Sequence, residues 1–115
     1  MSILDEFEGR LPGRQQSIFR TLESPADIQR YLDRLPYVGE ERDRCPLDVM
    51  QDEHCHCLDG GLFAAFALRR SGHPGLLIDL VPAHDRAGQK LDDDHVLAVF
   101  RRNGCWGAIA KSNYA

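Results

Sequence analysis

The feature that most constrains the fold of this chain is the apolar stretch over residues 58–70, which is long enough for more than three helical turns. Leucine, alanine and phenylalanine recur there at helical spacing and also fill the remaining faces. A helix that is apolar nearly all round is buried centrally in its domain. We therefore predict a central helix that opens at Cys57 and ends before Gly72, with other elements packed around it.

Short patterns on both sides of this segment predict the remaining elements. Gln15 to Leu22 reads as a short helix, and the pair Ser24-Pro25 starts a second one that Pro36 ends. Pro46 opens a further short helix through about Met50. The strands we expect span residues 76–81, 95–102 and 105–110, and Asn103-Gly104 forms a hairpin turn between the last two.

This order of elements favours one class of fold. Helices come first and strands follow, which is typical of an α+β protein rather than of alternating β-α-β units. A chain of 115 residues with 43% hydrophobic and 28% charged residues is ordinary for one globular domain, and it is unlike a disordered or fibrous protein. The prediction is a single α+β domain over residues 1–115, with the central helix packed on a small antiparallel sheet.

Charge and hydropathy exclude several classes of partner. The formal net charge is −4 and the basic residues are scattered, so we expect no nucleic-acid partner. No stretch approaches the ~18 apolar residues of a membrane span, so we expect no membrane partner. The N-terminus is acidic and lacks the pattern of a signal peptide, and we therefore expect a cytoplasmic protein.

The four cysteines, at positions 45, 55, 57 and 105, are expected to be reduced thiols in that compartment. Cys57 stands at the head of the central helix, where unpaired N–H groups and the helix dipole favour a thiolate, the nucleophilic form of cysteine. His95 begins a strand after three aspartates. A thiolate and an imidazole from a neighbouring strand form a common activated pair.

The run Cys57-Leu-Asp-Gly-Gly-Leu-Phe-Ala-Ala-Phe-Ala-Leu-Arg-Arg-Ser-Gly72, with His95-Val-Leu-Ala-Val-Phe and Asn103-Gly-Cys-Trp106, resembles the transglutaminase-like superfamily, whose core is related to papain-like cysteine proteases. The chain is similar to a small, bacterial-type member, with the resembling core over about residues 46–113. The resemblance implies a thiol-dependent acyl transferase or amide hydrolase without a cofactor. It implies Cys57 as nucleophile, His95 as general base and acid, and a peptide or other amide as substrate.

The third catalytic residue of the family pattern is missing at its usual place. An acid usually follows the tryptophan by about four positions, where this chain has Ala110. Asn113 is our candidate to orient the imidazole, as asparagine does in papain-type enzymes. Ser112, Asp79 and Asp94 are further candidates.

Three other residues are expected near the site. Gln51 stands six residues before Cys57, the spacing of the oxyanion-hole glutamine in papain-type enzymes. Trp106 is expected to line the site or to pack against Phe100, and His56 is expected to influence the thiol.

Two alternatives to an enzyme remain open. A catalytically degenerate domain of the same fold, used for binding, would account for the missing acid after Trp106. The run His54-Cys55-His56-Cys57 also has residues that bind zinc, although adjacent and alternate ligands strain the geometry around one ion. We therefore expect no metal in the site, and we keep a metal-binding module as the less favoured interpretation.

Overall fold

The computed structural model describes residues 3–38, 43–80, 86–87 and 95–111, and the structural statements below concern these residues. The elements in chain order are α1 (Ile3–Gly9), α2 (Gly13–Arg20), α3 (Pro25–Arg34), α4 (Pro46–Asp52), α5 (Cys57–Arg70), β1 (Leu76–Leu80), β2 (His95–Arg102) and β3 (Cys105–Ile109). The structure confirms the α+β class.

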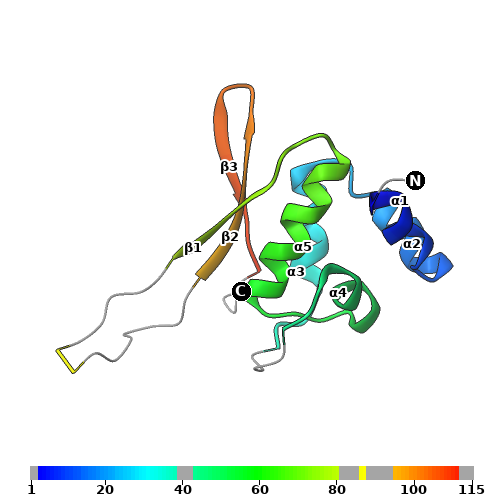
Figure 1. The fold of residues 1–115 in the computed structure, drawn as a ribbon, viewed down its shortest axis with the longest axis horizontal. Coiled ribbons are helices and arrows are strands. Elements are labelled where there is room, and N and C mark those ends of the chain that lie inside the picture. The colour runs from blue at the N-terminus through cyan, green and yellow to red at the C-terminus, as the bar shows by residue number, and fades with distance from the viewer. Residues whose placement is uncertain (1–2, 39–42, 81–85, 88–94, 112–115) are drawn as a thin grey trace.

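Helix α5 is the centre of the molecule (Figure 1). It lies between the three strands on one side and the other four helices on the other. Its side chains Phe63, Ala64, Ala67 and Leu68 are fully buried, and they join the core with Ile28 and Leu32 of α3 and with residues of α4 and β2. This confirms the central helix that the apolar stretch predicts.

The strands form one antiparallel sheet in the order β1-β2-β3. Along β2, Val96 and Ala98 are buried against α5, whereas Leu97 and Val99 are only partly buried. Ile109 of β3 pairs with Ala98 and is buried on the same side. Because side chains alternate along a strand, the sheet has an inner face toward α5 and an outer face away from it.

Local signals set several of the boundaries. The Ser24 side chain accepts a hydrogen bond of 3.2 Å from the N–H of Asp27 and caps α3, as predicted. Gly72 follows α5 with φ +84°, a left-handed conformation that suits glycine. Helix α1 was not predicted. Within the described part of the chain, no helix combines the length and the apolar character that crossing a membrane requires.

Candidate active site at the start of helix α5

Cys57 is the first residue of α5 and is half-buried. The sequence prediction that this cysteine opens the central helix is confirmed. The other cysteines lie in different surroundings, since Cys45 and Cys105 are exposed and Cys55 is buried. All four lie in described segments, and no disulfide joins any two of them. Cys45 also lies at a helix N-terminus, as the N-cap of the short helix α4, so what distinguishes Cys57 is its half-buried place in the first turn of the central helix.

A reciprocal capping box fixes the backbone beside Cys57. His56 is the N-cap, and its Nδ1 accepts a hydrogen bond of 3.4 Å from the N–H of Asp59. The Asp59 carboxylate in turn accepts from the N–H of His56 at 3.3 Å. Since Nδ1 is an acceptor, the ring proton is on Nε2, which lies 3.3 Å from Asp43 and 3.4 Å from Asp59. The His56 ring is thus held by polar contacts on both of its nitrogens.

Arg44 connects the segment before α4 to the first turn of α5. Its backbone N–H donates to Asp59 at 2.6 Å, and its guanidinium lies 3.9 Å from that carboxylate. Nε donates to Asp52 at 2.9 Å, and Nη2 donates to Nε2 of His54 at 2.6 Å. Arg44 is 4% exposed and Asp59 is fully buried, so this pair is shielded from solvent and holds the backbone on both sides of Cys57.

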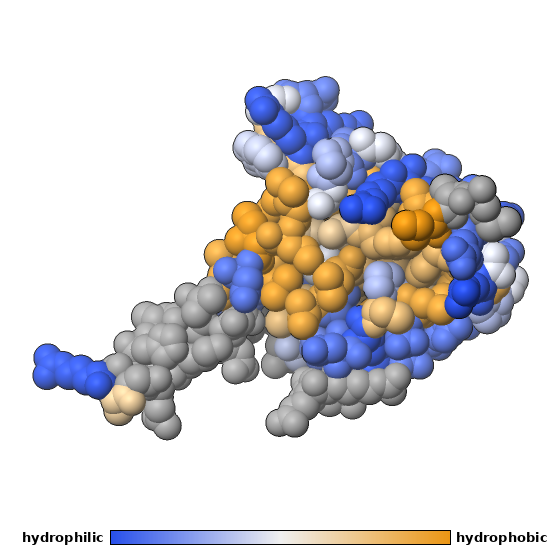
Figure 2. All heavy atoms as spheres, in the orientation of Figure 1, coloured by the Kyte–Doolittle hydropathy of each residue, from blue (hydrophilic) through white to orange (hydrophobic). Residues whose placement is uncertain are grey.

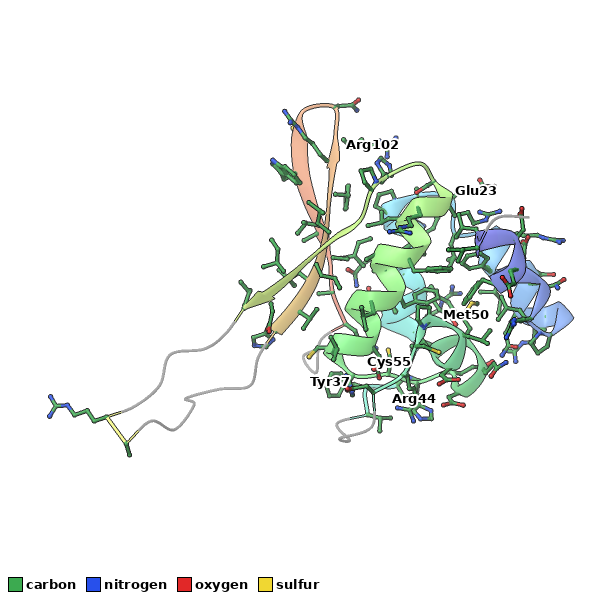
Figure 3. The ribbon with its side chains drawn as sticks, in the orientation of Figure 1. Glu23, Tyr37, Arg44, Met50, Cys55 and Arg102 are labelled. Carbon is green, nitrogen blue, oxygen red and sulfur yellow. The ribbon has the colours of Figure 1, made fainter. Side chains whose placement is uncertain are left out.

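Cys55 belongs to the support of the site rather than to its reactive part. Its backbone forms a parallel bridge with Tyr37, in which its N–H donates to Pro36 at 3.3 Å and its carbonyl accepts from Val38 at 3.1 Å. Figure 3 shows Tyr37, Arg44 and Cys55 close to the end of α5 that begins at Cys57. Burial raises the pKa of the Cys55 thiol to about 11, so this cysteine stays protonated at neutral pH.

Two glycines allow other elements to approach the first turn of α5. A Cβ on Gly61 would lie 2.8 Å from the Val96 side chain, and a Cβ on Gly60 would overlap Cβ of Lys111. Gly61 is four residues after Cys57 and therefore lies on the same side of the helix. The absence of these side chains brings the start of β2 and the segment after β3 against the turn that carries Cys57.

His95 is the first residue of β2, beside this contact, and it pairs with Leu80 of β1. It is partly buried. Side chains alternate along a strand and Val96 points to α5. The Cβ of His95 therefore lies on the outer face, with Leu97 and Val99. The structure thus places His95 beside the first turn of α5, which carries Cys57, but directs its Cβ away from that helix.

The remaining predicted residues are not gathered at Cys57. Gln51 is exposed on α4. Trp106 is 64% exposed on the outer face, and the Arg101 guanidinium lies 5.9 Å from the centre of its ring. It does not pack on Phe100, which covers Gly107 on the inner face.

The candidates for a third catalytic residue lie in different parts of the chain. Asp79 is exposed on β1, opposite Val96 and thus on the inner face of the sheet. Asn113, Ser112 and Asp94 lie outside the described residues.

The four residues of the proposed metal-binding run are separated by their contacts. His54 accepts from Arg44, Cys55 lies in the bridge with Tyr37, and His56 caps α5. Within the described segments, a different set brings three potential ligand atoms within 4.8 Å of one another, namely Asp43, His56 and Asp59. Those atoms already bind N–H groups and have the Arg44 cation beside them, which disfavours a metal ion.

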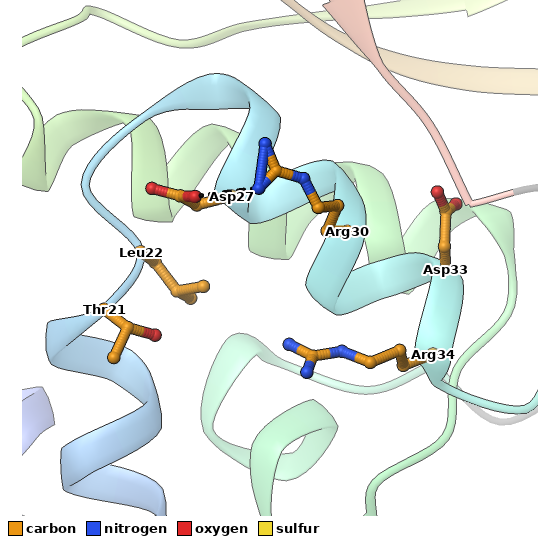
Figure 4. A pocket seen from close by; sticks show the side chains of 6 residues that line it. All are labelled: Thr21, Leu22, Asp27, Arg30, Asp33 and Arg34. Carbon is orange, nitrogen blue, oxygen red and sulfur yellow. Dashed lines mark hydrogen bonds and ion pairs between the residues drawn. The ribbon is translucent and has the colours of Figure 1, made fainter.

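A hollow elsewhere on the surface has no link to this site. It has a volume of about 500 Å³ and is lined by Thr21, Leu22, Asp27, Arg30, Asp33 and Arg34 (Figure 4). Asp27 and Arg30 form an ion pair of 3.4 Å within it. None of its lining residues comes from α5 or the sheet, and we assign it no chemical role.

Sequence reasoning missed the two residues that hold the site together. Asp59 had a signal, because an acid three residues after an N-cap is the pattern of a capping box. The prediction overlooked it because histidine is an unusual N-cap residue. Arg44 had no local signal, since its burial results from the approach of α4, α5 and residues 54–56.

Comparison with known proteins identifies the fold. No protein-family model matches the sequence, and no curated protein matches it. A crystal structure of the periplasmic domain of TgpA from Pseudomonas aeruginosa, bound to ethylmercury, superposes with a TM-score of 0.60 at 16% sequence identity. The match covers 90% of this chain and 46% of that one. The fold is transglutaminase-like.

Proposed function

We propose that this domain is a thiol-dependent acyl transferase or amide hydrolase with Cys57 as its nucleophile. The observation that carries the proposal is the position of Cys57, half-buried in the first turn of α5 within a transglutaminase-like fold, with the start of β2 packed on that turn. The substrate class is an amide, as in a peptide, and the reaction needs no cofactor. The reduced thiol that it requires fits a cytoplasmic setting.

The proposed chemistry takes place in two steps. The Cys57 thiolate attacks the carbonyl carbon, and backbone N–H groups at the start of α5 stabilise the negative charge on the oxygen. The C–N bond then breaks, and the amine leaves with a proton from the imidazolium of His95. In the second step, water or an acceptor amine attacks the thioester carbonyl and gives a proton to His95. The C–S bond breaks and releases the Cys57 thiolate, so the thiolate and the imidazolium are both restored.

His95 is the most demanding part of this proposal. The Cβ of His95 lies on the outer face of the sheet, so the imidazole has to pass around the end of β2 to reach the Cys57 thiol. Its position as the first residue of the strand makes such a path short, because no earlier residue of β2 stands between it and the helix turn. Asn113 is the proposed orienting residue, and it belongs to the part of the chain that lies outside the described residues.

The test is alkylation by iodoacetamide, followed by peptide mass spectrometry at each cysteine. We expect Cys57 to react faster than Cys45 and Cys105, although both of these are more exposed, and Cys55 to be protected. His95→Ala should slow Cys57 to the rate of the exposed pair. Equal rates for Cys45, Cys57 and Cys105 in the wild-type protein would contradict an activated nucleophile.

A second experiment follows the acyl-enzyme itself. With p-nitrophenyl acetate, the wild-type protein should release a burst of nitrophenol and carry one acetyl group on Cys57. Cys57→Ser should lack both, and Cys45→Ser should retain both. A burst that survives in Cys57→Ser would assign the reactivity to another residue.

A non-catalytic binding domain of the same fold is the second candidate. Two observations favour it: the outward start of the His95 side chain, and an apolar hollow of about 450 Å³ on the sheet, lined by Leu76, Leu77, Ile78, Val99 and Trp106. This candidate predicts slow, uniform alkylation of the accessible cysteines and no acetyl adduct.

A further inference from the structure

A small hollow lies where helices α2, α3 and α4 meet. It has a volume of about 230 Å³ and is lined by Arg14, Ile18, Tyr31, Arg34, Leu35 and Glu53. None of these residues takes part in the reaction proposed for Cys57. The volume is below the roughly 300–1,000 Å³ of pockets for drug-sized ligands, so the hollow suits one small molecule.

Hydrogen bonds between α2 and α4 fix the walls of this hollow. The buried Gln15 side chain of α2 donates to the carbonyl of Met50 at 2.8 Å and to the carboxylate of Glu53, the C-cap of α4, at 3.4 Å. Arg14 of α2 forms an ion pair of 3.1 Å with the same carboxylate. The charge of Glu53 is thus balanced within the protein, and the hollow has its shape before any ligand enters.

The Tyr31 hydroxyl faces this hollow. Tyr31 is 5% exposed, and its ring centre lies 5.4 Å from that of Phe63, so the ring is fixed in the core. Within the described segments, no group forms a hydrogen bond with its hydroxyl, and the oxygen is not sealed off from the hollow. Burial, followed by the charge of Glu53, raises the pKa of Tyr31 to about 12, so the hydroxyl is an O–H donor at neutral pH. A donor in such a place needs an acceptor, and the molecule that fills the hollow has to supply it.

Arg34 brings a positive charge to the same hollow. Among the residues that the structure describes, none forms a hydrogen bond or an ion pair with its guanidinium. Figure 4 shows this side chain extending from α3 toward the end of α2, whereas Arg30, one turn earlier, is paired with Asp27. Since Arg14 and Glu53 are paired with each other, Arg34 leaves the lining with an excess of positive charge. The hollow therefore presents one neutral and one cationic donor, which together suit an anion.

We propose that this hollow binds a carboxylate group carried by a short apolar chain. One carboxylate oxygen accepts from the Tyr31 hydroxyl and the other from the Arg34 guanidinium. The apolar chain packs against Ile18 and Leu35, which line the same hollow. Inorganic phosphate is a poorer match, because it has no apolar part for these two side chains and it brings more negative charge close to Glu53.

The experiment is a titration of the ¹⁵N-labelled protein with butyrate, followed by two-dimensional NMR of the backbone amides. We expect a dissociation constant of about 1 mM, in keeping with so small a ligand, and shifts concentrated at residues 14–18, 31–35 and 53. Butylamine has the same chain with the opposite charge and should not bind. Phosphate at equal ionic strength should bind about tenfold more weakly or not at all.

A carboxylate of this kind occurs both in free short-chain acids and at the C-terminus of a peptide. N-acetylvaline imitates the end of a peptide, so its affinity relative to that of butyrate distinguishes the two sources. Saturable binding of either acid at the expected residues supports the proposal, and the tighter of the two identifies the source.

Two substitutions test the two donors separately. Tyr31→Phe removes only the hydroxyl and should raise the dissociation constant of butyrate about fivefold. Because that hydroxyl has no partner among the described residues, the variant should keep the wild-type midpoint in urea. Arg34→Gln should raise the dissociation constant about tenfold. Arg30→Gln is the matched control on the same helix, and it should bind as the wild type does, as should Cys57→Ser, which shows that binding is independent of the proposed catalysis.

Several results would overturn the proposal. One is the absence of any saturable shift with butyrate, and another is binding that neither Tyr31→Phe nor Arg34→Gln weakens. Apolar side chains also gather over the strands (Figure 2), so shifts at Val99 and Trp106 instead would place the ligand in the hollow on the sheet. Phosphate binding as tight as that of butyrate would show a general attraction of anions to arginine and no site for a carboxylate.

Discussion

Replacing Asp59 by asparagine tests whether the buried network at the start of α5 holds the domain together. The two carboxylate oxygens accept from different backbone donors, Oδ1 from the N–H of Arg44 at 2.6 Å and Oδ2 from the N–H of His56 at 3.3 Å. Asparagine keeps one acceptor oxygen and places an NH₂ group against the other donor. It also removes the charge that faces the Arg44 guanidinium.

The expected loss follows from these contacts. A hydrogen bond to a charged acceptor contributes about 1.5–3 kcal/mol, and a buried donor without an acceptor costs about 1–3 kcal/mol. We therefore expect Asp59→Asn to lower the free energy of unfolding by about 2–4 kcal/mol. With a urea m-value of about 1.5 kcal/mol per molar, the unfolding midpoint should fall by roughly 1.3–2.7 M.

The measurement is urea denaturation followed by circular dichroism, with Asp33→Asn as control. Asp33 is exposed and accepts one hydrogen bond of 2.8 Å from Gln29, so its replacement should change the free energy of unfolding by less than about 0.5 kcal/mol. If the two variants unfold within about 0.5 kcal/mol of each other, the network does not contribute the stability that its burial implies.

Three further changes should each lower the free energy of unfolding. Cys55 has its pKa raised from 9.0 to about 11, so between these pH values the unfolded chain loses a proton that the folded chain keeps. The free energy of unfolding should therefore fall by about 2 kcal/mol from pH 9 to pH 11, and a Cys55→Ala variant should lose that part of the slope in denaturation curves. Gly60→Ala should destabilise the fold by about 1–3 kcal/mol, because its Cβ overlaps Lys111, whereas Gly9→Ala, with open space around it, should leave the unfolding midpoint unchanged or higher. Ser24→Ala removes the cap of α3 and should cost about 1 kcal/mol in the same assay, and a silent variant would mean that water replaces the cap.

Elements with a local chemical signal could be predicted from the sequence. Ser24-Pro25, Asn103-Gly104 and the apolar stretch of α5 each act through neighbouring residues, and the structure has the corresponding cap, turn and helix. Helix α1 has no such signal. Its Phe7 ring packs 5.0 Å from the ring of Phe19 and 4.6 Å from that of Phe66, contacts with later parts of the chain that the N-terminal sequence does not show.

The candidate site was predictable only in part, for a similar reason. The place of Cys57 follows from the helix that it opens, and the structure confirms that place. The face of the sheet on which His95 starts depends on the register of β2. Residues 96–99 of that strand are apolar on both faces, so the alternation that normally tells inside from outside is absent.

Lys111, near the end of the chain, completes the hydrogen bonding at the end of α3, near its beginning. Its ammonium group donates to the carbonyl oxygens of Leu32, at 2.7 Å, and of Leu35, at the C-terminal end of α3. These acceptors are synthesised more than seventy residues earlier, and a ribosome adds about 5–20 residues per second. Helix α3 therefore emerges several seconds before the residue that closes its last turn. Until Lys111 is added, the carbonyl oxygens of Leu32 and Leu35 lack the donor that they have in the folded domain, so the end of α3 is completed only after all three strands have been synthesised.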